Sequence, residues 1–386
     1  MQKDKKKLIR STTVPCSLDT FCCGLLAELK TDYDVVALSS PGPEMQTIAQ
    51  REGVRTIAVS MERHISPLKD LVSLFRLTAV LVKEKPHIIH SMTPKAGLLC
   101  MMAAWIARVP VRIHTFTGLV FPTSTGLKRR ILMLTDALTC ACATNVIAEG
   151  QGVRNDLVNH HITRKNPVVL GHGNVRGIDL EHYKLTPDLQ AKAQSIRQEQ
   201  GIADGDIVFL AVGRLVSDKG ITELVDAFVQ VLNTNPNVHL ILVGREEPEL
   251  DPLRPETVST IMMCPNIHTV GEQSDVRPFY GAATALVHAS YREGFPNVVI
   301  EAGAMQLPCI VTDINGSREI IINNRNGIIV PPRNTEALHT AMLRYTTDTA
   351  LRQQHAMEAR PLIAQRFEQG YVRQCLKEYY KKIITQ

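Results

Sequence analysis

Two acids, Glu293 and Glu301, lie eight positions apart in the stretch "YREGFPNVVIEAGAMQLPCIV", where the pattern predicts the start of a helix. Carboxylates do not suit a phosphate, but they accept hydrogen bonds from vicinal hydroxyls. We expect Asn297 to cap this helix and Glu301 to lie in its first turn, facing the same crevice as Glu293. One acid would then suit a sugar ring and the other a ribose.

The backbone at this helix start could bind an anion. Free N–H groups at the positive end of a helix point outward and favour a phosphate. The groups expected to do so are those of Gly294, Phe295, Asn297 and Val298.

A second loop supplies two cations. The apolar run "FLAV" reads as a strand, and residues 213–220, "GRLVSDKG", separate it from the helical pattern of "ITELVDAF". The planar guanidinium of Arg214 can donate two hydrogen bonds to one phosphate, and Lys219 offers a single positive charge. Gly220 permits close approach of a ligand to the backbone. Such a loop can hold a diphosphate.

Each of these groups has a purely structural alternative. A basic turn can be solvated, an acid such as Glu293 can belong to a surface loop, and Glu301 can simply favour the helix dipole. The alternatives weaken when both acids and both cations occur in one half of the chain, each after a predicted strand, because open parallel sheets bind ligands outside the carboxyl ends of their strands.

The elements that must position these residues alternate between strands and helices. Short β-branched runs predict strands in the first half, at "KLIRS", "DVVALSS", "TIAV", "HIIHS", "VRIHT" and "NVIA". A second series follows, at "IVFLAVGR", "HLILVGR", "IHTV", "ALVHAS", "PCIVTD" and "GIIV". Helical patterns lie between most of them, so the sequence predicts an α/β protein with two parallel sheets covered on both faces.

The chain of 386 residues is long enough for two domains. The glycine-bearing stretch "LGHGNVRGIDLEHY" is the expected hinge. We expect an N-terminal domain over residues 1–170 and a C-terminal domain over residues 171–370. The final stretch reads as a helix without a strand partner, so it either caps the second domain or crosses back. We expect residues 371–386 to complete the first domain.

Composition excludes several classes of protein. The net charge is +5 and aromatic residues make up 5% of the chain, without the alternation of basic and aromatic residues that indicates a nucleic-acid groove. The nine cysteines show no zinc spacing and suit reduced thiols in the cytoplasm. The basic start, with Lys3 and its neighbours, lacks a signal-peptide core, and "AGLLCMMAAWIA" is too short to span a membrane.

Several motifs resemble those of the family-four retaining glycosyltransferases, which have the GT-B fold. In chain order they are "GRLVSDKG", "VGRE", "VRPFYGAATALVHASYREGFPNVVIEAGAMQLPCIVTDINGSREII" and "NGIIVPP". The first half is similar to a bacterial branch that builds capsular and O-antigen polysaccharides, through "TVPCSLDTF", "SPLKDLVSLFRL", "KPHIIHSMTPKAGLL" and "RIHTFTGLVFP". The resemblance implies two Rossmann-like, doubly wound domains that face a central cleft.

The resemblance also implies a role for each acid and cation. In that family the residue matching Glu293 contacts the donor sugar, and the residue matching Glu301 contacts the nucleotide ribose. Arg214 and Lys219 match the pair that holds the donor diphosphate. Together with His114, we expect Glu293, Arg214 and Lys219 to be the catalytic residues.

Further donor contacts follow from the same resemblance. His114, at the end of "VRIHT", matches a histidine that faces the sugar and phosphate. Base recognition is expected near Arg245 and the backbone around Val270, and Gly213 opens the diphosphate loop. The first loop, "STTVPCS", has hydroxyls where many relatives have glycines, and Thr13 is the expected phosphate contact there.

The implied reaction moves a sugar with retention from a nucleotide-sugar, expected to be UDP-linked, without a metal or cofactor. Cations and helix N-termini would stabilise the leaving diphosphate. The expected acceptor is a growing glycan on undecaprenyl diphosphate, in surface polysaccharide synthesis, and Lys95 of "TPKAG" could receive its diphosphate.

A membrane contact is expected from the stretch "TGLKRRILMLTDAL". It could lie on an anionic membrane as an amphipathic helix, which would place the protein on the inner face of the cytoplasmic membrane. An ordinary two-faced core helix is the alternative. No nucleic-acid partner is expected.

Two other functions remain open at this stage. A nucleotide-sugar epimerase of GT-B-like fold would turn over the donor without an acceptor, and an inactive nucleotide-sugar-binding subunit would be expected to have lost the acid or cation pair, which is intact here. A metal pair at Asp32 and Asp34, in "TDYDVV", is instead expected to be a solvated turn at the amino edge of the sheet.

Overall fold

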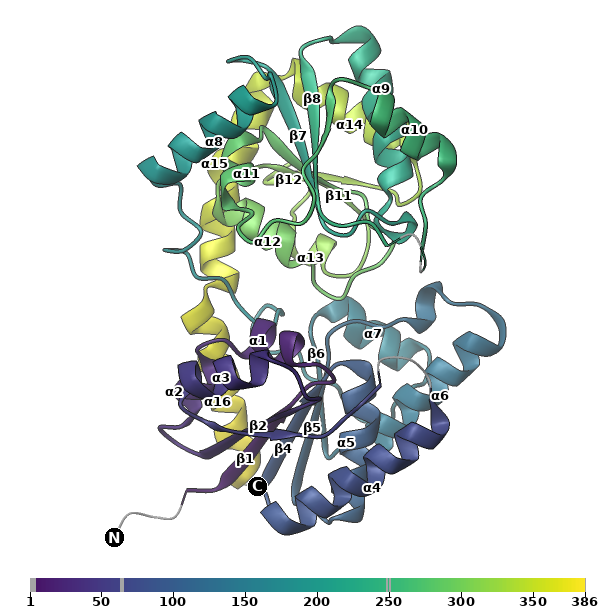
Figure 1. The fold of residues 1–386 in the computed structure, drawn as a ribbon, viewed down its shortest axis with the longest axis vertical. Helices are drawn as coiled ribbons and strands as arrows, with labels where there is room; N and C mark the ends of the chain where they lie inside the picture. Colours follow the sequence, from purple (N-terminus) through teal and green to yellow (C-terminus); the bar gives the residue numbers. More distant parts are fainter. Residues whose placement is uncertain (1–4, 63–65, 248, 250, 386) are drawn as a thin grey trace. The chain divides into compact units, whose positions relative to one another are not determined.

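The computed structural model describes residues 5–62, 66–247, 249 and 251–385, so Lys3 lies outside the described part. The chain forms two compact units, Met1–Gly177 with Gly370–Gln386, and Ile178–Gln369 (Figure 1). The sequence placed the divisions after residues 170 and 370, whereas the units separate after Gly177, within the glycine-bearing stretch, and after Gln369.

The first unit contains a six-stranded parallel sheet in the order β3-β2-β1-β4-β5-β6. Its strands are β1 (Lys7–Ser11), β2 (Asp34–Ser39), β3 (Arg55–Ala58), β4 (Ile88–Met92), β5 (Val111–Phe116) and β6 (Asn145–Ala148). The order reverses between β1 and β4, which is the doubly wound arrangement that binds ligands at its switch point.

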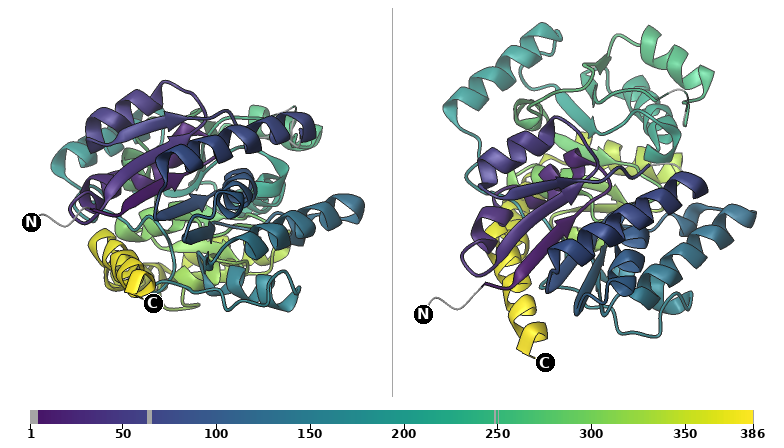
Figure 2. Two further views of the ribbon diagram at one scale, coloured as in Figure 1. Left: turned by 90° about the horizontal axis from the view of Figure 1, so that it is seen from below. Right: turned by 60° about the horizontal axis from the view of Figure 1, so that its bottom comes forward.

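Helices cover this sheet (Figure 2). They are α1 (Pro15–Cys22), α2 (Leu25–Leu29), α3 (Glu44–Glu52), α4 (Pro67–Glu84), α5 (Pro94–Ile106), α6 (Gly126–Cys142), α7 (Gln151–Asn159) and α16 (Gln369–Thr385), with a short 3-10 turn η1 (Phe121–Thr123). Proline begins α4 and α5, where its fixed φ suits the first helical turn.

The C-terminal helix α16 packs on the first unit. Leu376 and Tyr380 of α16 belong to the same apolar core as Leu8 and Leu26. Arg373 also forms an ion pair with Glu28 at 2.5 Å. The final helix therefore packs within the first unit.

The second unit repeats the architecture with the order β12-β11-β10-β7-β8-β9. Its strands are β7 (Ile207–Val212), β8 (Val238–Val243), β9 (Ile267–Thr269), β10 (Ala285–His288), β11 (Cys309–Thr312) and β12 (Gly327–Val330). Its helices are α8 (Pro187–Glu199), α9 (Ile221–Thr234), α10 (Pro255–Met263), α11 (Arg277–Ala282), α12 (Asn297–Ala304), α13 (Ser317–Ile320), α14 (Thr335–Thr347) and α15 (Thr349–Phe367), with a 3-10 turn η2 (Ser217–Lys219).

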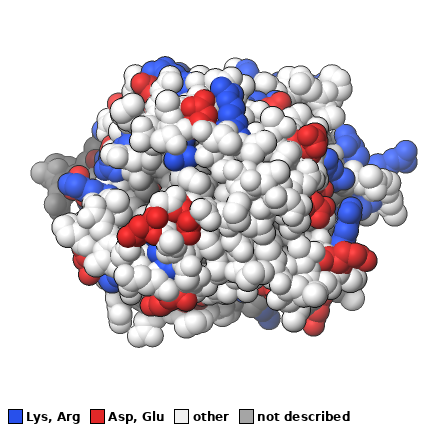
Figure 3. Space-filling model, turned by 90° about the horizontal axis from the view of Figure 1, so that it is seen from above, with Lys and Arg blue, Asp and Glu red and all other residues white. Residues whose placement is uncertain are grey.

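Burial explains why the strands read as continuous apolar runs. Every residue of β8, β10 and β11 is buried, because helices cover both faces of the sheet. Two parallel α/β sheets therefore confirm the fold class expected from the sequence. Among the described residues no helix is long and apolar enough to cross a membrane. Figure 3 shows acidic and basic side chains interspersed on one face, in keeping with the scattered charge of the sequence.

Candidate active site

Two loops meet at the carboxyl edge of the second sheet. One follows β7 and the other follows β10, and these two strands are hydrogen-bonded neighbours. The backbone N–H of Tyr291 donates to the carbonyl of Asp218 at 2.9 Å, and the Ser290 hydroxyl reaches the same carbonyl at 3.3 Å. The loops that the sequence singled out therefore form one surface.

Glycine is required where the backbones approach most closely. Gly220 has φ of +67° at the start of α9, and a Cβ there would lie 2.1 Å from the carbonyl oxygen of Ala289. Gly244 has φ of +149°, and its Cβ would lie 1.8 Å from the carbonyl oxygen of Gly213. Larger residues at either position would push the loops apart.

Lys219 and Glu293 form an ion pair across these loops. The Ser290 hydroxyl donates to the same Glu293 oxygen at 3.3 Å, and Nε2 of His288 lies 3.5 Å from it. Burial opposes ionisation of Glu293, but Lys219 and His288 outweigh it and lower the pKa of the carboxyl. Burial also lowers the pKa of His288 to about 4, so at neutral pH Glu293 is ionised beside a neutral imidazole.

Arg214 lies beside two acids. Its Nη1 donates to Glu247 at 2.5 Å and its Nη2 lies 3.8 Å from Asp218. Glu247 also accepts from Arg245 at 3.1 Å, so one carboxylate lies between the two arginines. The sequence analysis did not assign a role to Glu247.

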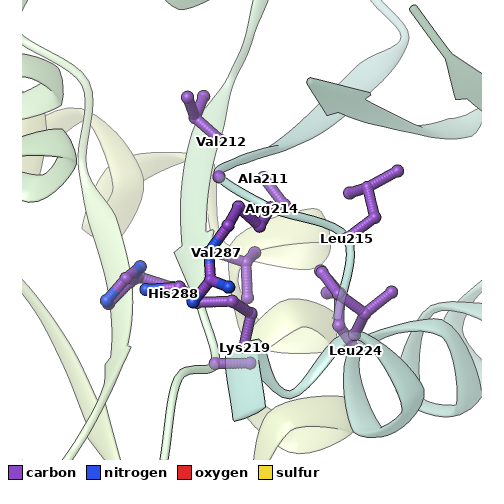
Figure 4. Close-up of a pocket in the computed structure, with 11 residues that line it drawn as sticks. Ala211, Val212, Arg214, Leu215, Lys219, Leu224, Val287 and His288 are labelled. Carbon is purple, nitrogen blue, oxygen red and sulfur yellow. The ribbon is translucent and has the colours of Figure 1, made fainter. Parts of the chain in front are cut away.

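The cationic side chains line a common pocket (Figure 4). Arg214, Lys219 and His288 lie on one side, and Leu215 and Leu224 lie on the other. Arg214 and Lys219 are the cationic groups of this pocket, and an anionic ligand would compete for them with their carboxylate partners Glu247 and Glu293.

Asp218 joins the two loops and was missed by the sequence analysis. Its carboxylate accepts from Arg292 at 3.0 Å and lies near Arg214, while its carbonyl binds the loop after β10 as described above. Its own N–H donates to Asp251 at 2.7 Å. A lone acid inside a basic loop gives no sequence signal for this role, because its partners are distant in the chain.

Glu301 is held by a tyrosine. The buried Tyr280 of α11 donates its hydroxyl to Oε2 of Glu301 at 3.0 Å, and the Glu301 side chain is itself largely buried. Burial and the neighbouring carboxylate raise the pKa of Tyr280 well above its usual value, so the phenol remains a donor. This contact fixes the direction of the Glu301 carboxylate.

The start of α12 differs in detail from the expectation. Pro296 occupies the cap position and Asn297 is the first helical residue, so Glu301 is the fifth residue of the helix and lies just beyond its first turn. The cap prediction was wrong because Pro296, with φ of −72° and ψ of 104°, is the last extended residue and Asn297 is already helical. Within the described part of the chain, the backbone N–H groups of Gly294, Phe295 and Val298 have no acceptor.

The region expected to contact a base is partly occupied. The N–H of Val270 donates to Leu242 at 3.1 Å, and its carbonyl accepts from the Gln273 side chain at 2.5 Å. A base that used this carbonyl would have to displace Gln273. Arg245, by contrast, leaves more than half of its side chain exposed.

His114 lies in the first unit and does not end its strand. It occupies the interior of β5 with 1% exposure, and its Nδ1 lies 2.8 Å from the Ser91 hydroxyl. A Cβ on Gly97 would lie 2.4 Å from its ring. Burial lowers its pKa to about 3. The strand-end position expected from the sequence was therefore wrong, and its catalytic role stays a prediction that this burial does not support.

Thr13 also lies in the first unit, in the loop after β1, where it contacts the start of α5. Its hydroxyl lies 2.8 Å from that of Thr93 and accepts the N–H of Ala96 at 3.1 Å. Thr93 has φ of +69°, a strained conformation for a threonine. Nearby, Lys95 forms an ion pair with Asp70 at 2.5 Å, so an acceptor phosphate at Lys95 would compete with this acid.

The structure gives no support to a metal site at Asp32 and Asp34. Asp34 begins β2, at the amino edge of the sheet, and lies 4.0 Å from Lys7. Over the described residues, no group of three or more His, Cys, Asp or Glu could hold a metal ion.

Comparison with known proteins agrees with this architecture. Residues 192–361 match the family described as "Glycosyl transferases group 1", and residues 20–173 match the "Glycosyl transferase 4-like domain". The chain is 30% identical over 359 residues to the capsular polysaccharide biosynthesis glycosyltransferase CapM of Staphylococcus aureus, covering 92% of each chain.

Two further proteins are informative. The UDP-Gal:alpha-D-GlcNAc-diphosphoundecaprenol alpha-1,3-galactosyltransferase of Escherichia coli is 27% identical, over 75% of this chain and 74% of the relative. The crystal structure of HepE from Anabaena, in complex with UDP and glucose, matches with a TM-score of 0.82 at 20% identity, covering 98% of this chain and all of the other. The chain therefore belongs to the group 1 glycosyltransferases, enzymes of GT-B fold that transfer sugars from nucleotide-sugars with retention.

Proposed function

We propose that this enzyme transfers a hexose from a UDP-sugar to a glycan on undecaprenyl diphosphate, during synthesis of a surface polysaccharide. The proposed binding of a UDP-sugar donor rests on one observation. Arg214, Lys219 and Glu293 lie together at one edge of the second sheet, and Glu301 lies on the helix that follows. Cations for a diphosphate and acids for hydroxyls are thereby brought together on one unit.

The donor is bound through a change of partners. The diphosphate attracts Lys219 and Arg214, whose present partners are the carboxylates of Glu293 and Glu247. Glu293, once released from Lys219, accepts hydrogen bonds from the donor sugar, and Glu301, oriented by Tyr280, accepts from the ribose. The N–H groups of Gly294, Phe295 and Val298 add donors for a phosphate oxygen.

The transfer itself leaves the diphosphate with increasing negative charge. The bond between the anomeric carbon and the phosphate oxygen breaks while an acceptor hydroxyl forms the new bond on the same face. The acceptor proton passes to the departing phosphate oxygen. Lys219 and Arg214 stabilise that oxygen and its neighbours electrostatically, so the step needs no metal.

The proposed donor and acceptor follow from the similar proteins. The E. coli relative is described as using UDP-Gal and a diphosphoundecaprenol-linked sugar, and the Anabaena structure contains UDP. The S. aureus relative is described as a capsular polysaccharide enzyme. These descriptions support a UDP-sugar and a lipid-linked glycan as the substrates to test first.

The outer face of α6 supports a membrane-bound acceptor. Leu127, Ile131, Leu134 and Leu138 follow one another at helical spacing and are 73%, 38%, 69% and 39% exposed. An ordinary core helix would present polar residues there. Lys128 and Arg130, both exposed near the start of α6, add positive charge for anionic headgroups.

Neighbouring helices extend this apolar face. On α4, Leu68 and Phe75 are 82% and 67% exposed, and on α5 Trp105 is 61% exposed. Both α4 and α6 pack against α5 in the helix layer of the first unit (Figure 2). We infer that this layer rests on an anionic bilayer at the inner face of the cytoplasmic membrane.

A reconstituted transfer assay tests the proposal. The enzyme is incubated with labelled UDP-galactose or UDP-glucose and undecaprenyl-diphosphate-linked N-acetylglucosamine in vesicles, with and without EDTA. The proposal expects a longer lipid-linked glycan with an α linkage, in equal yield with the chelator. Epimerised donor without acceptor, or binding of UDP-sugars without any transfer to a panel of lipid-linked glycans, would overturn it.

A further inference from the structure

Arg10 is an arginine in the core of the first unit. It lies on β1, opposite His90 of β4, and is 2% exposed. Its Nη1 contacts Nδ1 of His90 and donates to the Tyr380 hydroxyl at 2.8 Å, while Nη2 lies near the sulfur atoms of Cys22 and Met92. The guanidinium is thus surrounded by neutral or weakly accepting groups.

No carboxylate balances this charge. Within the described residues Arg10 has no acidic side chain at ion-pair distance, and its Nε–H has no acceptor. Burial, and then Arg10 itself, hold the pKa of His90 well below its usual value, and burial raises the pKa of Tyr380 to about 12, so both are neutral at pH 7. An arginine keeps its proton even when buried, and an unpaired buried charge is strongly destabilising.

A small cavity lies beside this guanidinium. The cavity has a volume of about 20 Å³, which suits a single water or a monatomic ion. Arg10, His90, Thr115 and Asn174 give it a polar side, and apolar residues of segment 170–175 and of α16 complete it. A water there could accept the free N–H, but it would not neutralise the charge.

We propose that this cavity binds a small monovalent anion, chloride under cellular conditions, against Arg10. The anion supplies the missing acceptor for Nε–H and the missing negative charge within the same volume. Asn174 lies three residues before the end of the first segment of this unit, and Val372 and Leu376 lie on the returning helix α16. The anion would therefore stabilise the packing of segment 170–175 and of α16 against β1 and β4. This effect would not depend on the sugar donor or the glycan acceptor.

Bromide provides a direct test on the full chain. Crystals grown in sodium bromide, measured at the bromine absorption edge, should show an anomalous peak inside this cavity next to Arg10. Bromide peaks confined to the surface, with ordinary water density in the cavity, would overturn the proposal.

Thermal unfolding gives a second readout. At constant ionic strength, replacing gluconate by chloride should raise the melting temperature of the wild type by roughly 3 to 6 °C, because an ion that binds only the folded state stabilises it. Arg10→Met, which removes the charge at similar volume, should abolish the chloride dependence whether it raises or lowers the melting temperature itself.

Arg360→Met is the matched control. Arg360 is a part-buried arginine of the second unit, and its guanidinium donates to the carbonyls of Leu180, Tyr183 and Ala304. This variant should lose stability but keep the full chloride effect. An equal chloride response in wild type and Arg10→Met, or tyrosinate absorption at neutral pH that disappears in Tyr380→Phe, would contradict an anion in the cavity.

Discussion

The ammonium of Lys219 and the carboxylate of Glu293 form an ion pair that joins the loop after β7 to the loop after β10. Each side chain is about one-fifth exposed, so the pair is shielded from water but open to a ligand on one side. A cation suited to a diphosphate and an acid suited to a sugar are therefore set side by side before any donor binds. The predictions below follow from this arrangement.

Removing either cation should slow transfer. Arg214→Ala and Lys219→Ala should each lower kcat/KM by roughly 100- to 1000-fold, since in the proposed site both cations stabilise the charge that grows on the leaving diphosphate. Steady-state kinetics with the labelled donor measures this. Arg325→Ala, which removes a half-exposed arginine paired with Glu358 at the surface, is the control and should keep wild-type kinetics. Wild-type kcat/KM in either loop variant would remove that cation from the site.

Asp218 should act as a positioning residue. Asp218→Asn keeps the backbone bonds to the second loop but weakens the hold on Arg292 and Arg214, so kcat/KM should fall by up to about 100-fold. The melting temperature should stay near that of the wild type, and Asp218→Glu should restore part of kcat. Glu358→Gln serves as the surface control. A loss of stability in proportion to the loss of activity would point to a merely structural role.

The apolar face of α6 should govern membrane binding and leave donor binding unchanged. Leu127→Ser with Leu134→Ser should reduce co-sedimentation with anionic vesicles, because each leucine removes apolar area from water when it enters the interface. Met262→Ser with Met263→Ser is the matched control, since these methionines are 80% and 83% exposed on the second unit. Equal vesicle binding by both double variants would contradict the proposed surface. The affinity of the α6 variant for UDP should equal that of the wild type, which shows that its donor site is intact.

Asp136 of α6 should make stability depend on pH. Burial raises its pKa from 3.8 to about 7, so the folded state holds this proton more tightly than the unfolded chain does. Its contribution is fully present below about pH 4 and is lost as the pH rises through about 7. Asp136→Asn should therefore raise the melting temperature at pH 8 and change it little at pH 4. A variant that is equally stable or less stable at pH 8 would show that the carboxyl is solvated.

The sequence predicted the positions of the strands better than the hydrogen bonds between side chains that are distant in the chain. All twelve strands were expected at their observed places, because buried parallel strands leave β-branched apolar runs between helical patterns. The loop residues Arg214, Lys219 and Glu293 were recognised because each follows such a run. The bonds from Tyr280 to Glu301 and from Arg292 to Asp218 join residues far apart in the chain, and periodicity carries no information about them.

The position of His114 within its strand was predicted wrongly. Its strand was expected to end one residue after it, but β5 continues to Phe116 and buries the ring under α5. A polar residue near a strand end reads the same in sequence whether it faces a ligand or the core. The ring packs against Gly97, and that tertiary contact could not be read from the sequence; the expected catalytic role of His114 stays a prediction.

The most direct test of the account is to measure UDP affinity and donor kinetics in Glu293→Gln and Glu301→Gln. In the proposed assignment Glu293 contacts the sugar, whose charge and shape change in the transition state, so its variant should bind UDP nearly normally in calorimetry but lose most of kcat. In the same assignment Glu301 contacts the ribose, which is bound alike in the ground state and the transition state, so its variant should bind UDP weakly and mainly raise the donor KM. The reverse pattern, or full activity in both variants, would contradict the assignment of the two acids to different parts of a nucleotide-sugar.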